Sequence, residues 1–382
     1  MRVAIAIDSF KGSLGSLEAG EAAAEGVRRA VPGAECFVRP LADGGEGTVS
    51  ALVAALGGTF REVRVTGPDG RPVVARYGLS GDGTAVMEMA EAAGISLVPR
   101  EERNPLVATT YGVGEMIADA IAAGAEKFLI GIGGSATNDA GAGMLQALGW
   151  RLLDAEDRDL PRGGAALSRL ARIEPPPSRA TPRFRVVCDV SNPLCGPSGA
   201  SAVFGPQKGA TPAMVAELDV ALARFASVAS SCLPSCPPAT SPGAGAAGGL
   251  GFALLAFLGA ELSPGADLVI EETGLEKFVE RADFVVTGEG RLDGQTAMGK
   301  APAGVARIAK RHGKPVIAFS GAIGDGAEAL NDAGIDAYFP ILRRICTLDE
   351  ALAPATAREN LSATAEQAFR LISAAACSRY CT

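Results

Sequence analysis

At both ends of the chain, short runs of apolar residues alternate with longer amphipathic stretches. Short apolar runs that stop at glycine or acidic residues indicate buried strands, and helical spacing indicates helices. Ser16 is expected to cap the first helix, and Pro302 suits the first turn of a later one. The first segment reads strand, helix, strand, helix over RVAIAID, SLEAGEAAAEGVRRA, ECFVRPLAD and GTVSALVAAL. The last segment repeats this order over DFVVTGEG, PAGVARIAKRHG, KPVIAFSG and ARENLSATAEQAFRLISAAA.

The middle of the chain follows a different pattern. From Arg61 onward, apolar residues alternate with polar ones around the turn sequence GPDG, which predicts an antiparallel meander. Strand and helix signals return over EKFLIGIGG, NDAGAGMLQALG, RFRVVCDV and residues 212–229. Residues 153–182 are expected to form a surface excursion, and SCLPSCPPATSPGAGAAGGLG a loop or hinge.

This arrangement predicts an α/β protein of two domains, one inserted into the other. Residues 1–62 and 283–376 are expected to form a parallel-sheet domain from both chain ends. Residues 63–282 are expected to form the inserted α/β domain, and residues 377–382 a tail without pattern.

Composition narrows the class of protein. The 382 residues are 48% hydrophobic and 20% charged, with a formal net charge of −8. No block of lysine or arginine occurs, which disfavours a nucleic-acid groove. No segment has the pattern of a signal peptide or the length of a membrane span, so we expect a soluble, cytoplasmic protein.

Cysteine and histidine usage limits the chemistry further. Eight cysteines and one histidine, His312, are present. Free thiols in a reducing compartment are the favoured interpretation, because a zinc site would need four thiolates from distant segments. A single histidine at a predicted helix end argues against a Ser-His-Asp triad.

Acidic residues follow five of the predicted strands. Ligands of open parallel sheets bind at the carboxyl ends of the strands, so these acids together predict a shared active-site cleft. One such acid alone would be a cap or turn residue. The acids are Asp8, Asp43, Asp139, Asp189 and the pair Glu289 and Asp293.

The sequence GIGGSATND allows three interpretations. Its hydroxyl and amide side chains favour a cradle for a phosphate or a carboxylate at a helix start. Gly131-x-Gly133-x-x-Ala136, with Asp154 about twenty residues on, instead resembles a dinucleotide fingerprint. A plain tight turn is the third possibility.

The sequence TGEGRLDGQTAMGKAP contains a near match to a P-loop. Gly294-x4-Gly299-Lys300 has the required spacing, but Ala301 replaces the hydroxyl residue that would hold Mg²⁺. A true P-loop is therefore disfavoured, and two interpretations stay open: a loop whose carboxylates hold Mg²⁺ and whose Lys300 neutralises phosphate, or a solvated polar turn that begins a surface helix. Lys11 and Lys208 stand in other glycine-bearing loops, where they could supply positive charge to an anion.

Seven motifs in register resemble the bacterial type I glycerate kinases over residues 1–375. They are DSFKGS, PLADGGEGT, GIGGSATNDAG, CDVSNPLCG, FGPQKGA, GAGAAGGLG and TGEGRLDGQTAMGKAP. The resemblance implies a Rossmann-like domain formed by both chain ends and an inserted flavodoxin-like domain. It also implies ATP- and Mg²⁺-dependent phosphorylation of D-glycerate to 2-phosphoglycerate, in glycerate, glyoxylate or sugar-acid catabolism. The expected partner is this small substrate, with no nucleic acid or membrane, in a monomer or homodimer.

The site residues that follow from the motifs fall into three groups. The catalytic candidates are Asp189, Asp293 and Lys11, with either aspartate as the proton acceptor. The Mg²⁺ candidates are Asp8, Glu289 and Asp293. The candidates for substrate or phosphate binding are Asp8, Ser9, Asp43, Gly44, Gly45, Glu46, Gly133, Gly134, Ser135, Thr137, Asn138, Asp139, Asn192, Gln207, Lys208, Arg291, Gln295 and Lys300.

Two other functions stay open at this point. A nicotinamide oxidoreductase would use Gly131–Ala136, although no histidine lies near that loop. A sensor would bind a small acid without ATP turnover, although the clustered carboxylates argue against it.

Overall fold

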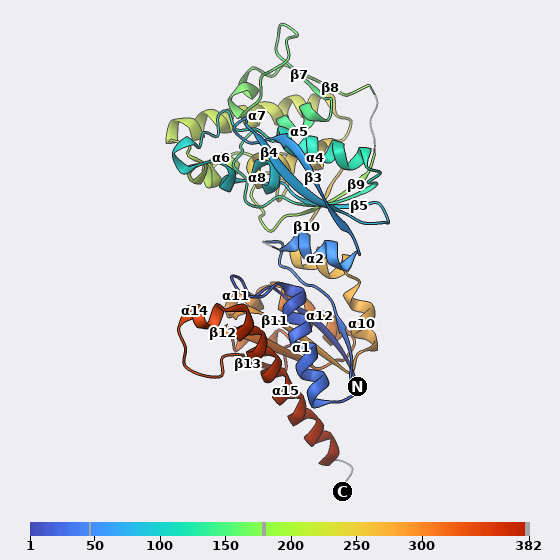
Figure 1. The fold of residues 1–382 in the computed structure, drawn as a ribbon. Helices are drawn as coiled ribbons and strands as arrows, with labels where there is room; N and C mark the ends of the chain where they lie inside the picture. Colours follow the sequence, from blue (N-terminus) through green and yellow to red (C-terminus); the bar gives the residue numbers. More distant parts are fainter. Residues whose placement is uncertain (46, 178–180, 379–382) are drawn as a thin grey trace. The chain divides into compact units, whose positions relative to one another are not determined.

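The computed structural model describes residues 1–45, 47–177 and 181–378, with the side chains of 376–378 left out. The chain forms two compact units (Figure 1). Unit 1 contains residues 1–56 and 265–382, and unit 2 contains residues 57–264. The predicted junctions at 62 and 282 therefore differ from the observed ones. The later junction moves because two helices that precede residue 282, α9 (Gly265–Glu272) and α10 (Leu275–Arg281), pack on β1 (Arg2–Ile7) and α12 (Ala301–Arg311) of unit 1.

Unit 1 is built on a parallel sheet of five strands in the order β13-β12-β11-β1-β2. Numbered within the unit alone, this is the 2-1-3-4-5 order of flavodoxin-like sheets. The connections leave β1 in opposite directions, so the strand order reverses between β1 and β11. The strands are β1 Arg2–Ile7, β2 Glu35–Val38, β11 Phe284–Leu292, β12 Val316–Ile323 and β13 Ala337–Pro340.

Helices cover both faces of this sheet. Large residues such as Ile5 and Ile7 face α1 and α15, whereas Ala4 and Ala6 face α9, α10 and α12. This alternation is what a period of two residues along a strand requires. The helices of unit 1 are α1 Ser16–Ala30, α2 Thr48–Ala55, α9 Gly265–Glu272, α10 Leu275–Arg281, α11 Gly294–Ala297, α12 Ala301–Arg311, α13 Ala329–Asp332, α14 Leu348–Leu352 and α15 Pro354–Ser378.

The predicted tail, residues 377–382, begins inside helix α15. Residues 377 and 378 continue this helix, and residues 379–382 lie outside the described residues.

Unit 2 contains a mixed sheet of six strands in the order β10-β9-β6-β5-β4-β3. The meander predicted around GPDG is the antiparallel part, β3 to β5, and the other strands are parallel. Hairpins join β3, β4 and β5, and the parallel strands that follow are added by crossovers on one side, so this order contains no reversal. The flavodoxin-like order thus belongs to the unit built from both chain ends and not to the insertion. The strands are β3 Thr59–Thr66, β4 Pro72–Leu79, β5 Thr84–Glu88, β6 Lys127–Gly131, β9 Arg183–Val187 and β10 Glu261–Ser263.

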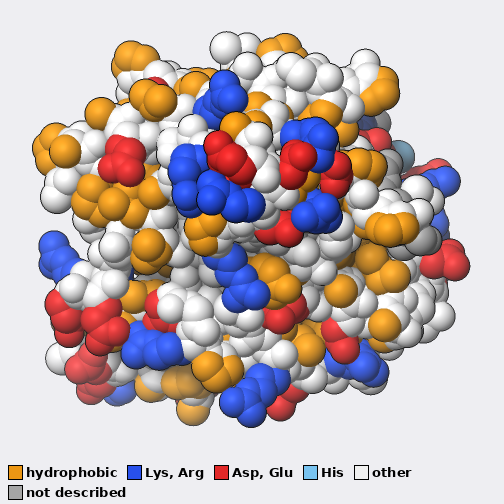
Figure 2. Space-filling model, turned by 90° about the horizontal axis from the view of Figure 1, so that it is seen from above, with side chains coloured by type: hydrophobic (Ala, Val, Ile, Leu, Met, Phe, Trp, Pro, Cys, Tyr) orange, Lys and Arg blue, Asp and Glu red, His pale blue; other side chains and the backbone are white. Residues whose placement is uncertain are grey.

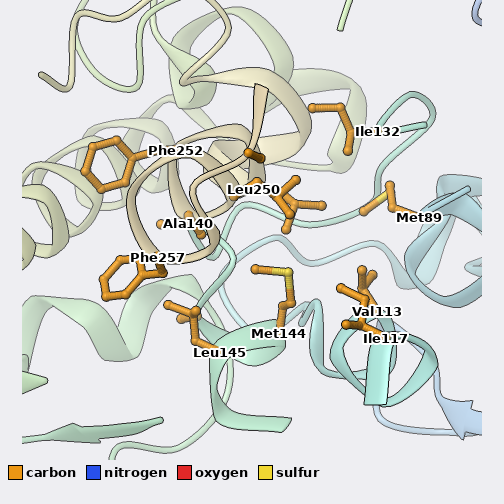
Figure 3. Packing of buried hydrophobic residues seen from close by; sticks show 14 of the residues in the cluster. Met89, Val113, Ile117, Ile132, Ala140, Met144, Leu145, Leu250, Phe252 and Phe257 are labelled. Carbon is orange, nitrogen blue, oxygen red and sulfur yellow. The ribbon is translucent and has the colours of Figure 1, made fainter. Parts of the chain in front are cut away.

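One apolar core holds unit 2 together. Met144 of α5 lies between Leu250 of α8 and the pair Val113 and Ile117 of α4, and Leu145 lies beside Phe257 of α8 (Figure 3). The α-helices are α3 Ala90–Ala93, α4 Tyr111–Ala122, α5 Ala142–Ala147, α6 Ala200–Phe204, α7 Pro212–Cys232 and α8 Ala246–Leu258. The 3₁₀ helices are η1 Ile95–Leu97, η2 Arg100–Glu102, η3 Gly164–Arg169 and η4 Pro206–Lys208.

The predicted surface excursion is partly buried. It contains half of the small hairpin of β7 Arg151–Leu153 and β8 Arg172–Glu174, and η3 packs on α7. Leu167 and Leu170 are at most 1% exposed, so this segment contributes to the core despite its Arg, Gly and Pro content.

The surface shows no large area of basic side chains among the described residues on the face drawn in Figure 2, as expected for a sequence without a block of lysine or arginine. On the face drawn in Figure 2, acidic side chains lie among the basic ones. Within the described ranges, no helix is long and apolar enough to cross a membrane. The six cysteines whose side chains are described, Cys36, Cys188, Cys195, Cys232, Cys236 and Cys346, are unpaired, and Cys377 and Cys381 lie outside that set.

We predict that Gly26→Ala destabilises unit 1. A Cβ atom at Gly26 of α1 would lie 2.0 Å from the backbone oxygen of Ser362 in α15, so the two helices would have to separate. Overpacking of this kind costs roughly 1–3 kcal/mol of unfolding free energy, measurable by urea denaturation. Gly81→Ala is the control, because its Cβ would meet no atom within 4 Å. Equal stability of both variants would contradict the close α1–α15 contact.

Candidate active site

The first group of site residues lies where the strand order of unit 1 reverses. Asp8 follows β1, and Glu289 stands on β11, the neighbouring parallel strand. The backbone N–H of Asp8 donates to the carbonyl of Gly288 over 2.8 Å, which joins the two carboxyl ends. Open α/β sheets bind ligands in the crevice at such a reversal.

Ser16 joins a third loop to this edge instead of capping its helix. Its hydroxyl donates to the carbonyl of Ile7 over 2.6 Å and accepts from the N–H of Leu41 over 2.7 Å. The N-cap of α1 is Gly15. The predicted cap is therefore wrong, and the hydroxyl instead ties the loop that carries Asp43 to the end of β1.

Three carboxylates influence one another at this edge. Burial, followed by the negative charge of Asp43, raises the pKa of Asp8 to about 7, while the N–H of Ser9 and the charge of Lys11 oppose the shift. Burial also raises the pKa of Glu289, whose Oε1 atom accepts a 2.5 Å hydrogen bond from Thr296. A buried acidic cluster of this kind favours a bound cation.

Basic side chains lie beside these acids. The Lys11 Nζ atom is 3.5 Å from the Asp43 carboxylate, and the Arg291 Nε atom is 3.5 Å from that of Asp293. Lys11 and Arg291 each expose 65% of their side chain, so both can reach an anion. Lys300 is half-buried and lowers the pKa of Glu289.

The near match to a P-loop does not form one. Asp293 caps helix α11, with its Oδ1 atom accepting from the N–H groups of Gln295 and Thr296. These amides are therefore already paired, whereas a P-loop directs such amides to phosphate oxygens. Gly299 and Lys300 then lead into α12, so the spacing match is coincidental.

A pocket of about 400 Å³ contains most of this group. Its charged lining includes Asp8, Lys11, Glu289, Arg291 and Lys300. Ser9 and Asp293 also line it, whereas Asp43, Gly44, Gly45 and Gln295 do not. Glu46 lies outside the described residues.

The second group of site residues lies in the loop after β6 of unit 2. Lys208 from η4 is buried, and its Nζ atom donates to Ser135 Oγ over 2.7 Å and to the Thr137 carbonyl over 2.6 Å. Burial lowers the pKa of Lys208 to about 7, although the charge of Asp139 opposes the shift. Lys208 is therefore a buried side chain that holds the loop after β6 in place.

Asp139 also has a structural role. Its fully buried carboxylate accepts from the N–H and hydroxyl of Thr110 and from the N–H groups of Gly141 and Gly143. These donors open helices α4 and α5, so one side chain ties both helix starts. Burial raises the pKa of Asp139, and these hydrogen bonds lower it.

Two buried atoms of the same loop lack partners. Within the part of the chain that the structure describes, Thr137 Oγ1 and Asn138 Oδ1 accept and donate no hydrogen bond. Each unpaired buried polar atom costs about 1–3 kcal/mol. A ligand hydroxyl could donate to Asn138 Oδ1, and a ligand hydroxyl or oxyanion could accept from the Thr137 hydroxyl.

The motif GAGAAGGLG supports this loop from behind. Gly248 and Gly249 have positive φ angles, and a Cβ atom on Gly248 would lie 2.0 Å from the Thr137 carbonyl. The N–H of Ala140 donates to the Gly248 carbonyl. Two glycines are therefore needed for the backbones to touch.

The remaining candidates of unit 2 are more exposed. Asp189 is exposed two residues beyond β9, and the Asn192 amide donates to the Ser198 carbonyl. Gln207 is exposed beside Lys208, whereas Gly133 and Gly134 stand in the loop after β6.

The dinucleotide interpretation fails on geometry. Helix α5 begins only at Ala142, well after Gly131–Ala136, so these glycines do not open the helix that follows them. Asp154 instead binds the N–H groups of Glu156 and Arg158 and the Arg158 side chain, within its own turn.

Sequence reasoning missed several polar residues of the site. Thr110, Ser201 and Thr296 hydrogen-bond Asp139, Asn138 and Glu289 respectively. Thr110 immediately precedes helix α4, which is a recognisable capping signal. No local signal marks Ser201, because its partner is far away in the sequence.

A Mg²⁺ ion would need ligands beyond the protein. Among residues 1–45, 47–177 and 181–378, no three His, Cys, Asp or Glu side chains converge to hold a metal ion. Mg²⁺ in phosphoryl-transfer sites commonly uses one or two carboxylates together with waters and substrate phosphates. Asp8 and Glu289 fit that smaller donor set.

Comparisons with known proteins agree on one family. A statistical model of the glycerate kinase family matches residues 3–373. A glycerate kinase of Bacillus subtilis is 52% identical, covering 92% of this chain and 93% of the relative. A glycerate 2-kinase of Escherichia coli is 48% identical, covering 95% and 98%. The crystal structure of a candidate glycerate kinase 2 from Salmonella typhimurium LT2 superimposes with a TM-score of 0.90 at 48% identity, covering 98% and 99%.

We predict that Lys208 makes stability depend on pH. Its folded pKa near 7 lies below the ordinary value of 10.5, so the unfolded chain binds more protons between these values. The unfolding free energy should therefore rise with pH from about 7 to 9, by roughly 1 kcal/mol per pH unit relative to Lys208→Met. Urea denaturation at several pH values measures this difference. Exposed Lys277→Met is the control, and a pH-independent difference for Lys208→Met would refute the shift.

Proposed function

Since the chain belongs to the glycerate kinase family, we propose that it transfers the terminal phosphoryl group of ATP to a hydroxyl of D-glycerate. The observation that carries this proposal is the gathering of buried acids and exposed cations where the strand order of unit 1 reverses. The product is 2-phosphoglycerate, as the name of the Escherichia coli relative suggests, in glycerate, glyoxylate or sugar-acid catabolism.

Asp8 and Glu289 would hold Mg²⁺. Both carboxylates are buried and have raised pKa values, so a nearby positive charge stabilises their ionised forms. A bound Mg²⁺ ion neutralises the charge of the nucleotide phosphates. Asp43, which acts on both carboxyl groups through its charge, keeps the same loop edge negative.

Lys11, Arg291 and Lys300 would neutralise the nucleotide phosphates. Phosphoryl transfer depends mainly on positioning and charge neutralisation, which suits cations that line one pocket. The ion pairs of Lys11 and Arg291 are long, at 3.5 Å, and solvent-exposed, so exchanging a carboxylate for a phosphate costs little.

Asp189 and Asp293 are the two candidates for accepting the hydroxyl proton, and we take Asp189 first because its side chain is exposed. Asp293 already uses its Oδ1 atom to accept two N–H groups of α11, and its Oδ2 atom faces Arg291. That arrangement suits a residue that positions the arginine and the helix. Asp189 is exposed on a loop after a parallel strand, where it can reach a substrate.

The loop after β6 would bind the glycerate carboxylate or hydroxyl groups. Ser135, Thr137 and Asn138 supply hydroxyl and amide groups, and two of their buried atoms lack partners among the described residues. Lys208 and Asp139 act through this loop as positioning residues.

Phosphorus NMR tests the proposed reaction directly. The purified protein with ATP, Mg²⁺ and D-glycerate should give a new phosphomonoester signal and ADP. Addition of authentic 2- and 3-phosphoglycerate identifies the hydroxyl that reacts. A folded protein that yields no phosphomonoester would refute the kinase proposal for this substrate, and a 3-phosphoglycerate signal would refute the regiochemistry.

We expect Asp189→Asn to lower kcat by about 10²–10⁴-fold while the protein stays folded, because general-base catalysis contributes this much. A coupled assay of ADP release measures the rate, and circular dichroism checks the fold. Asp157→Asn is the matched control, since Asp157 is exposed with a positive φ that asparagine also tolerates. Near-normal turnover of Asp189→Asn would remove the residue from the mechanism.

A further inference from the structure

The pocket of unit 1 has a charged half and an apolar half. Besides the residues that follow β1 and β11, its wall includes Ile341 and Leu342, beyond β13, and Leu348, Ala351 and Leu352 of α14. The proposed phosphate and Mg²⁺ chemistry uses only the charged half. The apolar half has no role in that chemistry.

Hydrogen bonds fix the backbone of the apolar wall, but leucine side chains on it stay exposed to solvent. The N–H of Ile341 donates to the Ser320 carbonyl over 2.8 Å, and Thr347 and Glu350 form a capping box at the start of α14. Leu348 is nevertheless 72% exposed and Leu342 is 42% exposed. A solvent-exposed leucine side chain contributes almost no hydrophobic free energy to folding.

The pocket is larger than a small acid alone would fill. At about 400 Å³, it falls within the roughly 300–1,000 Å³ of pockets that hold drug-sized ligands. A three-carbon hydroxy acid would fill a small part of it and has no apolar surface for α14. The matching ligand is anionic at one end and has a less polar group at the other that can contact leucine side chains.

We propose that this pocket binds the nucleotide, with the base lying against Leu348 and Leu352 of α14 and the phosphates towards Lys11, Arg291 and Lys300. The inference rests on the proposed kinase function, since ATP is the ligand of that reaction with both chemical ends. The nucleoside then binds to unit 1. Because only a nucleotide has a base to contact α14, this helix distinguishes a nucleotide from free polyphosphate.

Binding of nucleotide and of tripolyphosphate separates the two ends of the pocket. The full chain carrying Leu348→Ala and Leu352→Ala is titrated calorimetrically with a non-hydrolysable ATP analogue and with tripolyphosphate, both with Mg²⁺. Losing two apolar contacts should weaken analogue binding about tenfold and leave tripolyphosphate binding unchanged. Leu371→Ala is the control, because this leucine of α15 is 69% exposed and does not line the pocket.

The steady-state constants must change in the same sense. The double variant should show a KM for ATP raised about tenfold, with the KM for glycerate and the kcat at saturating ATP nearly unchanged. A raised KM for glycerate with an unchanged KM for ATP would assign the pocket to the acceptor and overturn the inference. Unchanged nucleotide affinity would overturn it as well.

Photolabelling locates the base without any substitution. Trypsin cleavage after Arg344 and Arg358 releases α14 within one peptide, residues 345–358. An 8-azido-ATP label in this peptide that excess ATP prevents supports the inference, and ATP-protected labels only elsewhere refute it. A wild-type protein that forms phosphoglycerate while failing these tests loses only this inference, whereas one that forms none loses the proposed function.

Discussion

The reversal of strand order at β1 is the constraint on which the site of unit 1 depends. Because β2 and β11 flank β1 and their connections diverge, the carboxyl ends of β1 and β11 open into a crevice. Asp8 and Glu289 stand at those two ends, and the Ser16 hydroxyl draws the Asp43 loop to the same edge. Burial raises the pKa of Asp8 and of Glu289 at these ends, and the negative charge of Asp43 adds to both shifts.

In unit 2, buried hydrogen bonds hold the polar loop after β6 in place. Two buried ionisable residues, Lys208 and Asp139, form these hydrogen bonds with backbone and hydroxyl groups. Two glycines in left-handed conformation let a second loop pack directly behind it. A loop positioned this firmly can present polar groups to a ligand with little ordering cost.

Local sequence predicted most of the strands and longer helices, because period and glycine placement are local signals. The helix predicted over Ser16–Ala30 has those bounds, and the meander around GPDG is antiparallel as expected. The role of Ser16 was wrong because Gly15 occupies the cap and the hydroxyl is recruited by Ile7 and Leu41. The junction predicted at 282 was displaced because two helices pack across it onto unit 1.

The sequence by itself determined the α/β class, the acidic loops after the strands and the family resemblance, since all three depend on residue type and order. Only the tertiary structure decided which acids share an environment and which cations are available. Lys11 and Lys208 have similar glycine-bearing surroundings in the sequence, yet one is exposed at a pocket and the other is buried with two hydrogen bonds. Leu348 and Leu352 carry no local signal at all, because their meaning comes from the charged groups that the fold places across from them. Burial and the identity of distant neighbours are properties of the packed chain, and no local pattern encodes them.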